Sequence, residues 1–169
     1  AGALYLQNGQ GSFTLTGDQP WEDDAISEDM GAVFFDADQD QDLDLYIVSG
    51  GNELPVNSPF LQDRLYLNDG KGQFSKTAAS LPLLTASGSR VRVGDFDGDG
   101  DQDLFVGGRI VGKSYPLPAQ SYLLRNDGLK DGAPQFSDVT EALAPQLSSA
   151  GLVTDAAWVD LDQDQQLDL

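Results

Sequence analysis

Short apolar runs alternate with polar stretches along the whole chain, a pattern that predicts β-strands rather than helices. The apolar runs are Ala32 to Phe35, Leu43 to Val48, Val91 to Val93, Leu104 to Val106 and Ala156 to Val159. The chain has 19 glycines and 8 prolines, and it lacks the long Ala/Glu/Lys/Leu-rich stretches that long helices use. We therefore expect an all-β fold of short strands joined by many turns.

An aspartate-rich segment follows the first strand in three places, and the three copies align without gaps. The copies are residues 36–44, 95–103 and 160–168. A second element also repeats: an apolar strand, an Asn/Asp-Gly turn and a second strand, as in Leu65 to Phe74, with copies in residues 4–13 and 123–136. Such turns are a strong signal for a tight antiparallel hairpin.

The repeating unit is about 60 residues long and has four predicted strands, which is the composition of one blade of a β-propeller. The predicted divisions are residues 1–30 (the end of one blade and a connector), 31–88 (a blade), 89–150 (a blade) and 151–169 (the start of a further blade). Two whole blades and two fragments do not close a ring. We therefore expect a partial ring whose remaining blades belong to a longer polypeptide.

The chain is strongly acidic, with 28 Asp and Glu against 9 Lys and Arg and a formal net charge of -19. Nucleic acid and anionic membrane surfaces repel such a chain, so we expect neither as a partner. No apolar run approaches the roughly 20 residues of a membrane-spanning helix. With no cysteine and no histidine, the chain has no disulfide framework, thiolate nucleophile, Ser-His-Asp triad or His-ligated metal site.

Half of the acids lie in the three repeated segments, where aspartates occupy positions 1, 3, 5 and 9 of every copy and position 7 of the first two. Alternate spacing in a curled loop brings side chains to one centre, and Ca²⁺ takes six to eight hard oxygen ligands at roughly 2.3–2.6 Å. A backbone carbonyl at position 7 would complete each set, so we expect about three calcium ions, one per loop. The candidate ligands are Asp36, Asp38, Asp40, Asp42 and Asp44; Asp95, Asp97, Asp99, Asp101 and Asp103; and Asp160, Asp162, Asp164, Gln166 and Asp168.

Position 6 of such a loop requires a positive φ, which glycine adopts freely. The second segment has Gly100 there, but the first has Gln41 and the third has Gln165. A strain of about 1 kcal/mol is expected at each glutamine, which would weaken those two sites. An EF-hand fits less well, since its acidic ligand at position 12 would here be Ile47 or Val106, within an apolar strand.

The segment from Gly94 to Val106, together with the Leu-Tyr-Leu-Asn-Asp-Gly hairpin that starts at Leu65, resembles the FG-GAP/VCBS repeat family, which includes the propellers of integrin α subunits. The resemblance covers essentially the whole chain. It implies a seven-bladed propeller with calcium in the loop between the first two strands of a blade. Gln41 and Gln165 depart from the family pattern.

Three functions are compatible with these features. The first is a non-enzymatic module in which calcium stiffens the blades and the propeller face binds a protein or a glycan. The second is a carbohydrate-active enzyme, a polysaccharide lyase or glycosidase; its signature would be an acid outside the loops that is buried and has a raised pKa. The third is a structural part of a surface assembly.

We favour the first function and expect no catalytic residues. Calcium loops of this kind are filled at the roughly millimolar calcium found outside cells, which predicts an extracellular, cell-surface or periplasmic location. The aromatic residues on strands, such as Phe34 and Phe105, are expected to pack between blades. Trp21 lies in an acidic connector and is the one aromatic residue expected to be exposed for contact with a partner.

Overall fold

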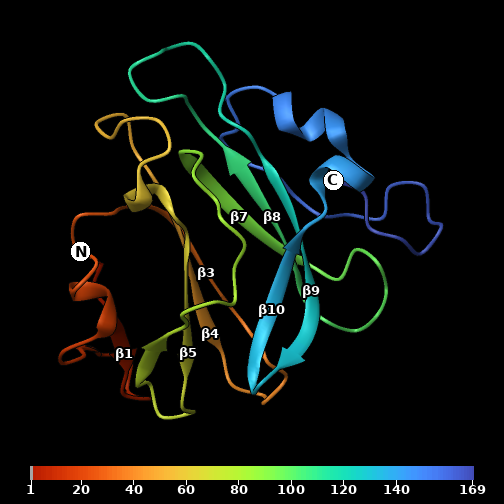
Figure 1. Ribbon diagram of the computed structural model, residues 1–169. Helices are drawn as coiled ribbons and strands as arrows, with labels where there is room; N and C mark the ends of the chain where they lie inside the picture. Colours follow the sequence, from red (N-terminus) through yellow and green to blue (C-terminus); the bar gives the residue numbers. More distant parts are fainter. Residues whose placement is uncertain (1) are drawn as a thin grey trace.

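A computed structural model describes residues 2–169 as antiparallel sheets that follow one another along the chain (Figure 1). The first sheet is a hairpin of β1 (Tyr5–Gln7) and β2 (Phe13–Leu15). The second contains β3 (Glu28–Phe35), β4 (Asp44–Gly50), β5 (Arg64–Asn68) and β6 (Phe74–Lys76). The third contains β7 (Gly88–Gly94), β8 (Asp103–Gly108), β9 (Tyr122–Lys130) and β10 (Ala133–Asp138).

Both larger sheets are four-stranded meanders with strands in chain order, as expected for propeller-type blades. The all-β prediction is thus confirmed, and a seven-bladed ring stays a prediction. Within residues 2–169, helix is confined to α1 (Thr140–Leu143) and to short 3-10 turns at Pro20–Glu22, Pro59–Leu61 and Pro145–Ser149. No helix in the described part of the chain is long and apolar enough to cross a membrane.

The two blades share their register as well as their strand order. Phe35 pairs with Asp44 where β3 meets β4, and Gly94 pairs with Asp103 where β7 meets β8. A register shift also recurs at equivalent places, between Asp29 and Gly31 in β3 and between Gly88 and Arg90 in β7. β3 and β7 continue through these bulges, so both strands are longer than the apolar runs at residues 32–35 and 91–93 from which they were predicted.

The predicted third copy of the first strand, at Ala156 to Val159, is reduced to one bridge between Val159 and Asp168. In the two complete blades the partner strand begins at position 9 of the acidic loop, at Asp44 in β4 and at Asp103 in β8.

The main core lies between the two blades, whose broad faces pack together. Its largest fully buried side chains come from the central strands of each sheet, where Tyr46, Val48 and Leu65 face Leu104, Val106 and Leu124. Glycine allows the backbones to approach: a Cβ on Gly31 would lie 2.7 Å from the carbonyl oxygen of Ser89. The interface therefore fixes the position of one blade's loops relative to the next.

Trp21 does not occupy the exposed position that its acidic neighbours suggested. Only 3% of its surface is exposed, and its ring packs edge-on against Tyr66 at 5.7 Å and beside Phe74 at 5.5 Å. The 3-10 turn at Pro20–Glu22 carries the indole into a second core on the second sheet, beside Leu4, where its Nε1 donates to the Gly2 carbonyl at 3.1 Å. Conversely, Phe34 is 46% exposed, although it was expected to pack between blades.

Candidate metal centre

The three acidic segments form loops of one design, named here loop 1 (residues 36–44), loop 2 (95–103) and loop 3 (160–168). Position 6 has a positive φ in each: 75° at Gln41, 95° at Gly100 and 71° at Gln165. The predicted left-handed backbone is therefore present even where the residue is glutamine. Position 4 is left-handed as well, with φ values of 63° at Gln39 and 65° at Gln163.

The carboxylates hold each loop closed through backbone hydrogen bonds that repeat position by position. The acid at position 1 accepts from the N–H of position 6: Asp36 from Gln41 at 3.1 Å, Asp95 from Gly100 at 3.1 Å and Asp160 from Gln165 at 3.0 Å. The acids at positions 3 and 5 each accept from the N–H two residues further on. The period-two spacing of the aspartates is thus explained first by the turn geometry.

The acid at position 9 clamps the loop to the rest of its blade. Asp44 is fully buried and accepts from the N–H of Ala37 at 2.9 Å and of Asn68, in the β5–β6 hairpin, at 2.9 Å. Asp103 makes the same pair of bonds with Phe96 and Asn126 in the next blade. Asp168 accepts from Leu161 at 2.9 Å in loop 3.

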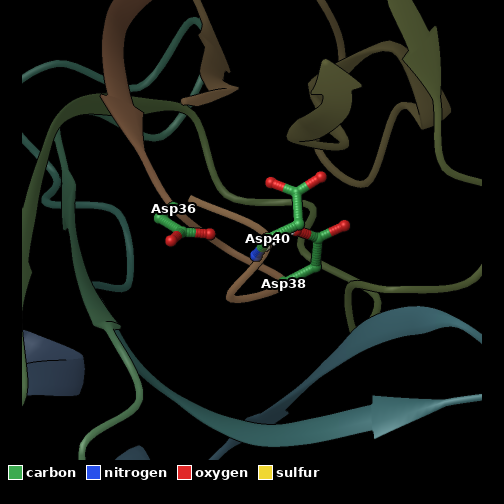
Figure 2. A group of neighbouring side chains, drawn as sticks. All are labelled: Asp36, Asp38 and Asp40. Carbon is green, nitrogen blue, oxygen red and sulfur yellow. Dashed lines mark hydrogen bonds between the residues drawn. The ribbon is translucent and has the colours of Figure 1, made fainter. Parts of the chain in front are cut away.

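Carboxylate oxygens gather in all three loops at separations that suit a single ion. In each loop, one oxygen from each of three aspartates lies within 4.8 Å of the others; the groups are Asp36, Asp38 and Asp40, then Asp95, Asp97 and Asp99, then Asp160, Asp162 and Asp168. Figure 2 shows the first group, with the three side chains carried by one tight loop. Loops 1 and 2 thus gather positions 1, 3 and 5, whereas loop 3 gathers positions 1, 3 and 9.

Loop 1 also contains carboxylate oxygens that are buried without a hydrogen-bond donor: Oδ1 of Asp36 and Oδ1 of Asp42. Buried acceptors are normally paired, and an unpaired one is a sign of an ion or water. The oxygens that do accept a backbone hydrogen bond keep a second lone pair. An all-oxygen donor set of this kind fits Ca²⁺, the ion for which these loops were predicted from the sequence to supply ligands.

The remaining predicted ligands are less centrally placed. Asp44 and Asp103 belong to the backbone clamps, and Asp164 lies outside the group of loop 3. Asp42, Asp101 and Gln166, at position 7, were expected to contribute their backbone carbonyls rather than their side chains. The side chain of Asp42 lies close to the β5–β6 turn, where a Cβ on Gly70 would be 3.2 Å from its Oδ2.

The electrostatics of the loops favour a bound cation. Desolvation raises the pKa of Asp38, and repulsion from Asp40 adds to the effect. Burial likewise raises the pKa of Asp44 and of Asp103 to about 6, although backbone N–H groups oppose the shift. A cation at the centre of each loop would reverse this repulsion and favour the ionised carboxylates.

One buried acid lies outside the loops, and sequence reasoning did not identify it. Asp63 is 4% exposed, and desolvation raises its pKa to about 7 against the lowering effect of hydrogen bonds from Ser49 and Tyr46. Its Oδ1 accepts from the Ser49 N–H and its Oδ2 from the Tyr46 hydroxyl, both at 2.7 Å. Asp63 also borders a cleft of about 320 Å³ that Lys76 and Asp24 line as well.

The next blade makes the corresponding contact without an acid. There Ser121 Oγ accepts from the Gly108 N–H at 2.9 Å, and Phe105 occupies the place of the tyrosine. A tyrosine with an aspartate in one blade thus corresponds to a phenylalanine with a serine in the other. This exchange indicates that Asp63 serves to pair the Tyr46 hydroxyl.

Repeated four-stranded meanders, each with an aspartate loop between its first two strands, define a propeller-type repeat protein with candidate cation sites. Residues 36–106 match the family model of the FG-GAP-like repeat, so this part of the chain carries that repeat. The match runs from the start of loop 1 through loop 2 to β8 and confirms, over these residues, the resemblance seen in the sequence. No curated protein matches the chain.

Proposed function

We propose that the chain is a calcium-binding propeller module of a secreted or cell-surface protein, which serves as a scaffold for binding a protein or a glycan. The observation that carries the proposal is the threefold recurrence of one loop geometry with converging carboxylate oxygens. Turn formation alone accounts for the hydrogen bonds, but it leaves Asp36 Oδ1 and Asp42 Oδ1 buried without a donor. A cation held by Asp36, Asp38 and Asp40 would supply the missing partner of Asp36 Oδ1.

Calcium suits these loops better than magnesium does. Mg²⁺ demands a near-octahedral shell at 2.0–2.1 Å and keeps most of its water, whereas Ca²⁺ accepts six to eight oxygens in irregular geometry. The donors here are carboxylates, with a predicted backbone carbonyl, from one irregular loop, which matches the second preference. The absence of histidine and cysteine removes the ligands that zinc and copper prefer.

The role proposed for calcium is to stiffen the blades. Each loop joins the first two strands of its blade, and position 9 ties loops 1 and 2 to the hairpin of the last two strands. A bound ion would hold all four strands at that end, and rigid strand ends with variable loops make a broad binding surface. Sites of moderate affinity would fill at extracellular calcium, which supports a location outside the cytosol.

A carbohydrate-active enzyme is the second candidate, because Asp63 has the burial and the raised pKa expected of a catalytic acid. Two features argue for a structural role instead. Both oxygens of Asp63 are already hydrogen-bonded within the protein, and its counterpart in the next blade is Ser121. We therefore keep the non-enzymatic scaffold as the proposal.

Thermal unfolding with EDTA and with 1 mM calcium, combined with calorimetric titration, tests the proposal. A site with a Kd of about 10 µM contributes about 2.7 kcal/mol at that concentration, which raises the Tm by roughly 5–10 °C. We expect about three ions, a clear preference over magnesium, and a smaller shift when Asp97→Asn disables loop 2. Asp18→Asn, an exposed acid outside the loops, is the matched control. No heat and no shift would refute the calcium function.

A further inference from the structure

Loops 1 and 2 belong to different blades, yet a buried network of hydrogen bonds around Asn126 joins them. The side chain of Asn126, in the β9–β10 hairpin, donates through Nδ2 to the carbonyl of Ala37 in loop 1 at 3.1 Å. Its own N–H donates to Asp103, the clamp residue of loop 2, at 2.8 Å. The N–H of Ala37 is in turn held by Asp44, the clamp residue of loop 1.

Every residue of this hydrogen-bond network is shielded from water. Asp44 and Asp103 are 0% exposed, Asn126 is 1% exposed and Ala37 is 2% exposed. A buried network of this kind is costly to leave partly unpaired, since each lost partner leaves a desolvated polar group behind. The closed forms of the two loops therefore support each other through Asn126.

Two further bonds cross between the loops at the surface. The N–H of Asp36, at position 1 of loop 1, donates to Oε1 of Gln102 in loop 2 at 3.2 Å. In the other direction, the Gln39 amide of loop 1 donates to the Asp101 carboxylate of loop 2. Residues of each loop thus bind the backbone or the side chain of a candidate ligand residue in the other.

The junction between loops 2 and 3 is built differently. Leu167 stands in loop 3 where Gln102 stands in loop 2, and Gly98 stands in loop 2 where Gln39 stands in loop 1. Beside these loops the contact is a ring stack, with Trp158, just before loop 3, on Phe96 of loop 2 at a centroid distance of 6.0 Å. The hydrogen bonds that cross here, such as the one from Trp158 Nε1 to the Arg92 carbonyl at 3.3 Å, join residues outside the two loops. The chain therefore contains one polar junction and one apolar junction between neighbouring loops of the same design.

We propose that cation binding in loops 1 and 2 is positively coupled through this polar junction, whereas loops 2 and 3 bind independently. The inference rests on the proposed calcium function and adds to it. An ion that orders one loop also orders the Asn126 network, so the second ion has less of the shared structure left to order. Couplings of this kind are typically about 5-fold or more in affinity.

Charge alone predicts the opposite sign, because the first divalent ion reduces the negative potential that attracts the second. That repulsive effect acts at both junctions and is screened over about 8 Å at physiological ionic strength. Measurements at that salt concentration therefore separate the two mechanisms. A positive coupling restricted to loops 1 and 2 cannot arise from charge.

Calorimetric titration of the full chain with calcium tests the proposal, with individual loops disabled by Asn at positions 3 and 5. Loop 2 is measured alone, with loop 1 active (Asp162→Asn and Asp164→Asn), and with loop 3 active (Asp38→Asn and Asp40→Asn). We expect calcium affinity in loop 2 to be about 5-fold higher when loop 1 is active, and to be unchanged by loop 3. The affinity ratio is the calcium affinity of loop 2 with loop 1 active divided by its affinity with loop 1 disabled. A ratio at or below one overturns the coupling.

The coupling is then removed without touching a candidate ligand. Asn126→Ala removes a buried side chain and risks unfolding, so the exposed pair Gln39→Asn and Gln102→Leu is the better variant. Gln102→Leu installs the residue found in loop 3, and asparagine tolerates the left-handed backbone of position 39. We expect the ratio to fall at least twofold, whereas Gln163→Asn, the same change in loop 3, leaves it unaltered; an unchanged ratio in the double variant would overturn the assignment of these links.

The outcomes separate this inference from the function on which it rests. Binding in every loop with no difference between the paired and the isolated states preserves the calcium function and refutes the coupling. No heat in the unaltered chain refutes both.

Discussion

The buried carboxyl of Asp63 makes a quantitative prediction about stability and pH. Its pKa is raised from the ordinary 3.8 to about 7, chiefly by desolvation. Between these values the folded chain keeps a proton that the unfolded chain has released. The free energy of unfolding therefore falls as the pH rises from about 4 to about 7, by about 1.4 kcal/mol per pH unit and about 4 kcal/mol in all.

Asp63→Asn removes the titration while it retains the shape of the side chain and an acceptor for the Ser49 N–H. We expect the free energy of unfolding of this variant to fall about 4 kcal/mol less than that of the unaltered chain over the same pH range. The double variant Tyr46→Phe and Asp63→Ser recreates the Phe105 and Ser121 pair of the next blade and should show the same weak pH dependence. Tyr46→Phe alone removes a hydrogen bond that lowers the pKa, so the fall should extend above pH 7.

Urea denaturation at closely spaced pH values, in a fixed excess of calcium, measures these differences. The acids of the loops titrate in every variant, so their contribution cancels when variants are compared. Ser121→Ala is the control, because it removes the corresponding acceptor of the next blade without removing a titratable group. The same pH slope in Asp63→Asn as in the unaltered chain would refute the assignment of a raised pKa to this carboxyl.

Three further predictions concern the backbone and the second core. Gln41→Gly relieves the left-handed strain at φ 75° and should tighten calcium binding in loop 1 by roughly 5-fold, as seen by calorimetry; unchanged affinity would contradict the strain. Gly31→Ala places a Cβ 2.7 Å from the Ser89 carbonyl and should cost about 1–3 kcal/mol in urea denaturation, whereas Gly17→Ala, with no atom within 4 Å, should be tolerated; equal effects would contradict the close contact. Trp21→Ala empties the second core and should cost about 3–5 kcal/mol by the same assay, and a near-neutral result would place the indole outside the core.

Much of the fold was predictable because the same loop and turn motifs recur at equivalent positions in each repeat. The acidic loops marked where the first strand of a blade ends, and the Asn/Asp-Gly turns marked the last hairpin. The positive φ at Gln41 followed from Gly100 at the same position of another copy. Local geometry of this kind is decided by neighbouring residues, so one chain with three copies was enough to infer it.

The features that sequence reasoning missed depend on contacts between distant residues. Asn126 and Ala37 are 89 positions apart, and nothing local to either residue indicates their hydrogen bond. The acidic residues around Trp21 pointed to solvent, but its aromatic partners Tyr66 and Phe74 lie far along the chain. The burial of Asp63 also depends on a residue distant in the sequence, Tyr46. Here the aligned repeats do contain a signal, because Phe105 stands in the second blade where Tyr46 stands in the first.

The difference between the polar and the apolar loop junctions has a consequence for how such a gene can change. Unequal recombination between repeats deletes or duplicates whole blades, and it joins halves that were not neighbours before. Removal of the unit between loops 1 and 2 would set Gln39 opposite Gln166 in place of Asp101, leaving its amide without the carboxylate it now binds. The same change would set Asp36 opposite Leu167 in place of Gln102, leaving its N–H without an acceptor. The blades are therefore alike in fold but not interchangeable in order, because the residues at positions 4, 7 and 8 of each loop must match those of the neighbouring loop.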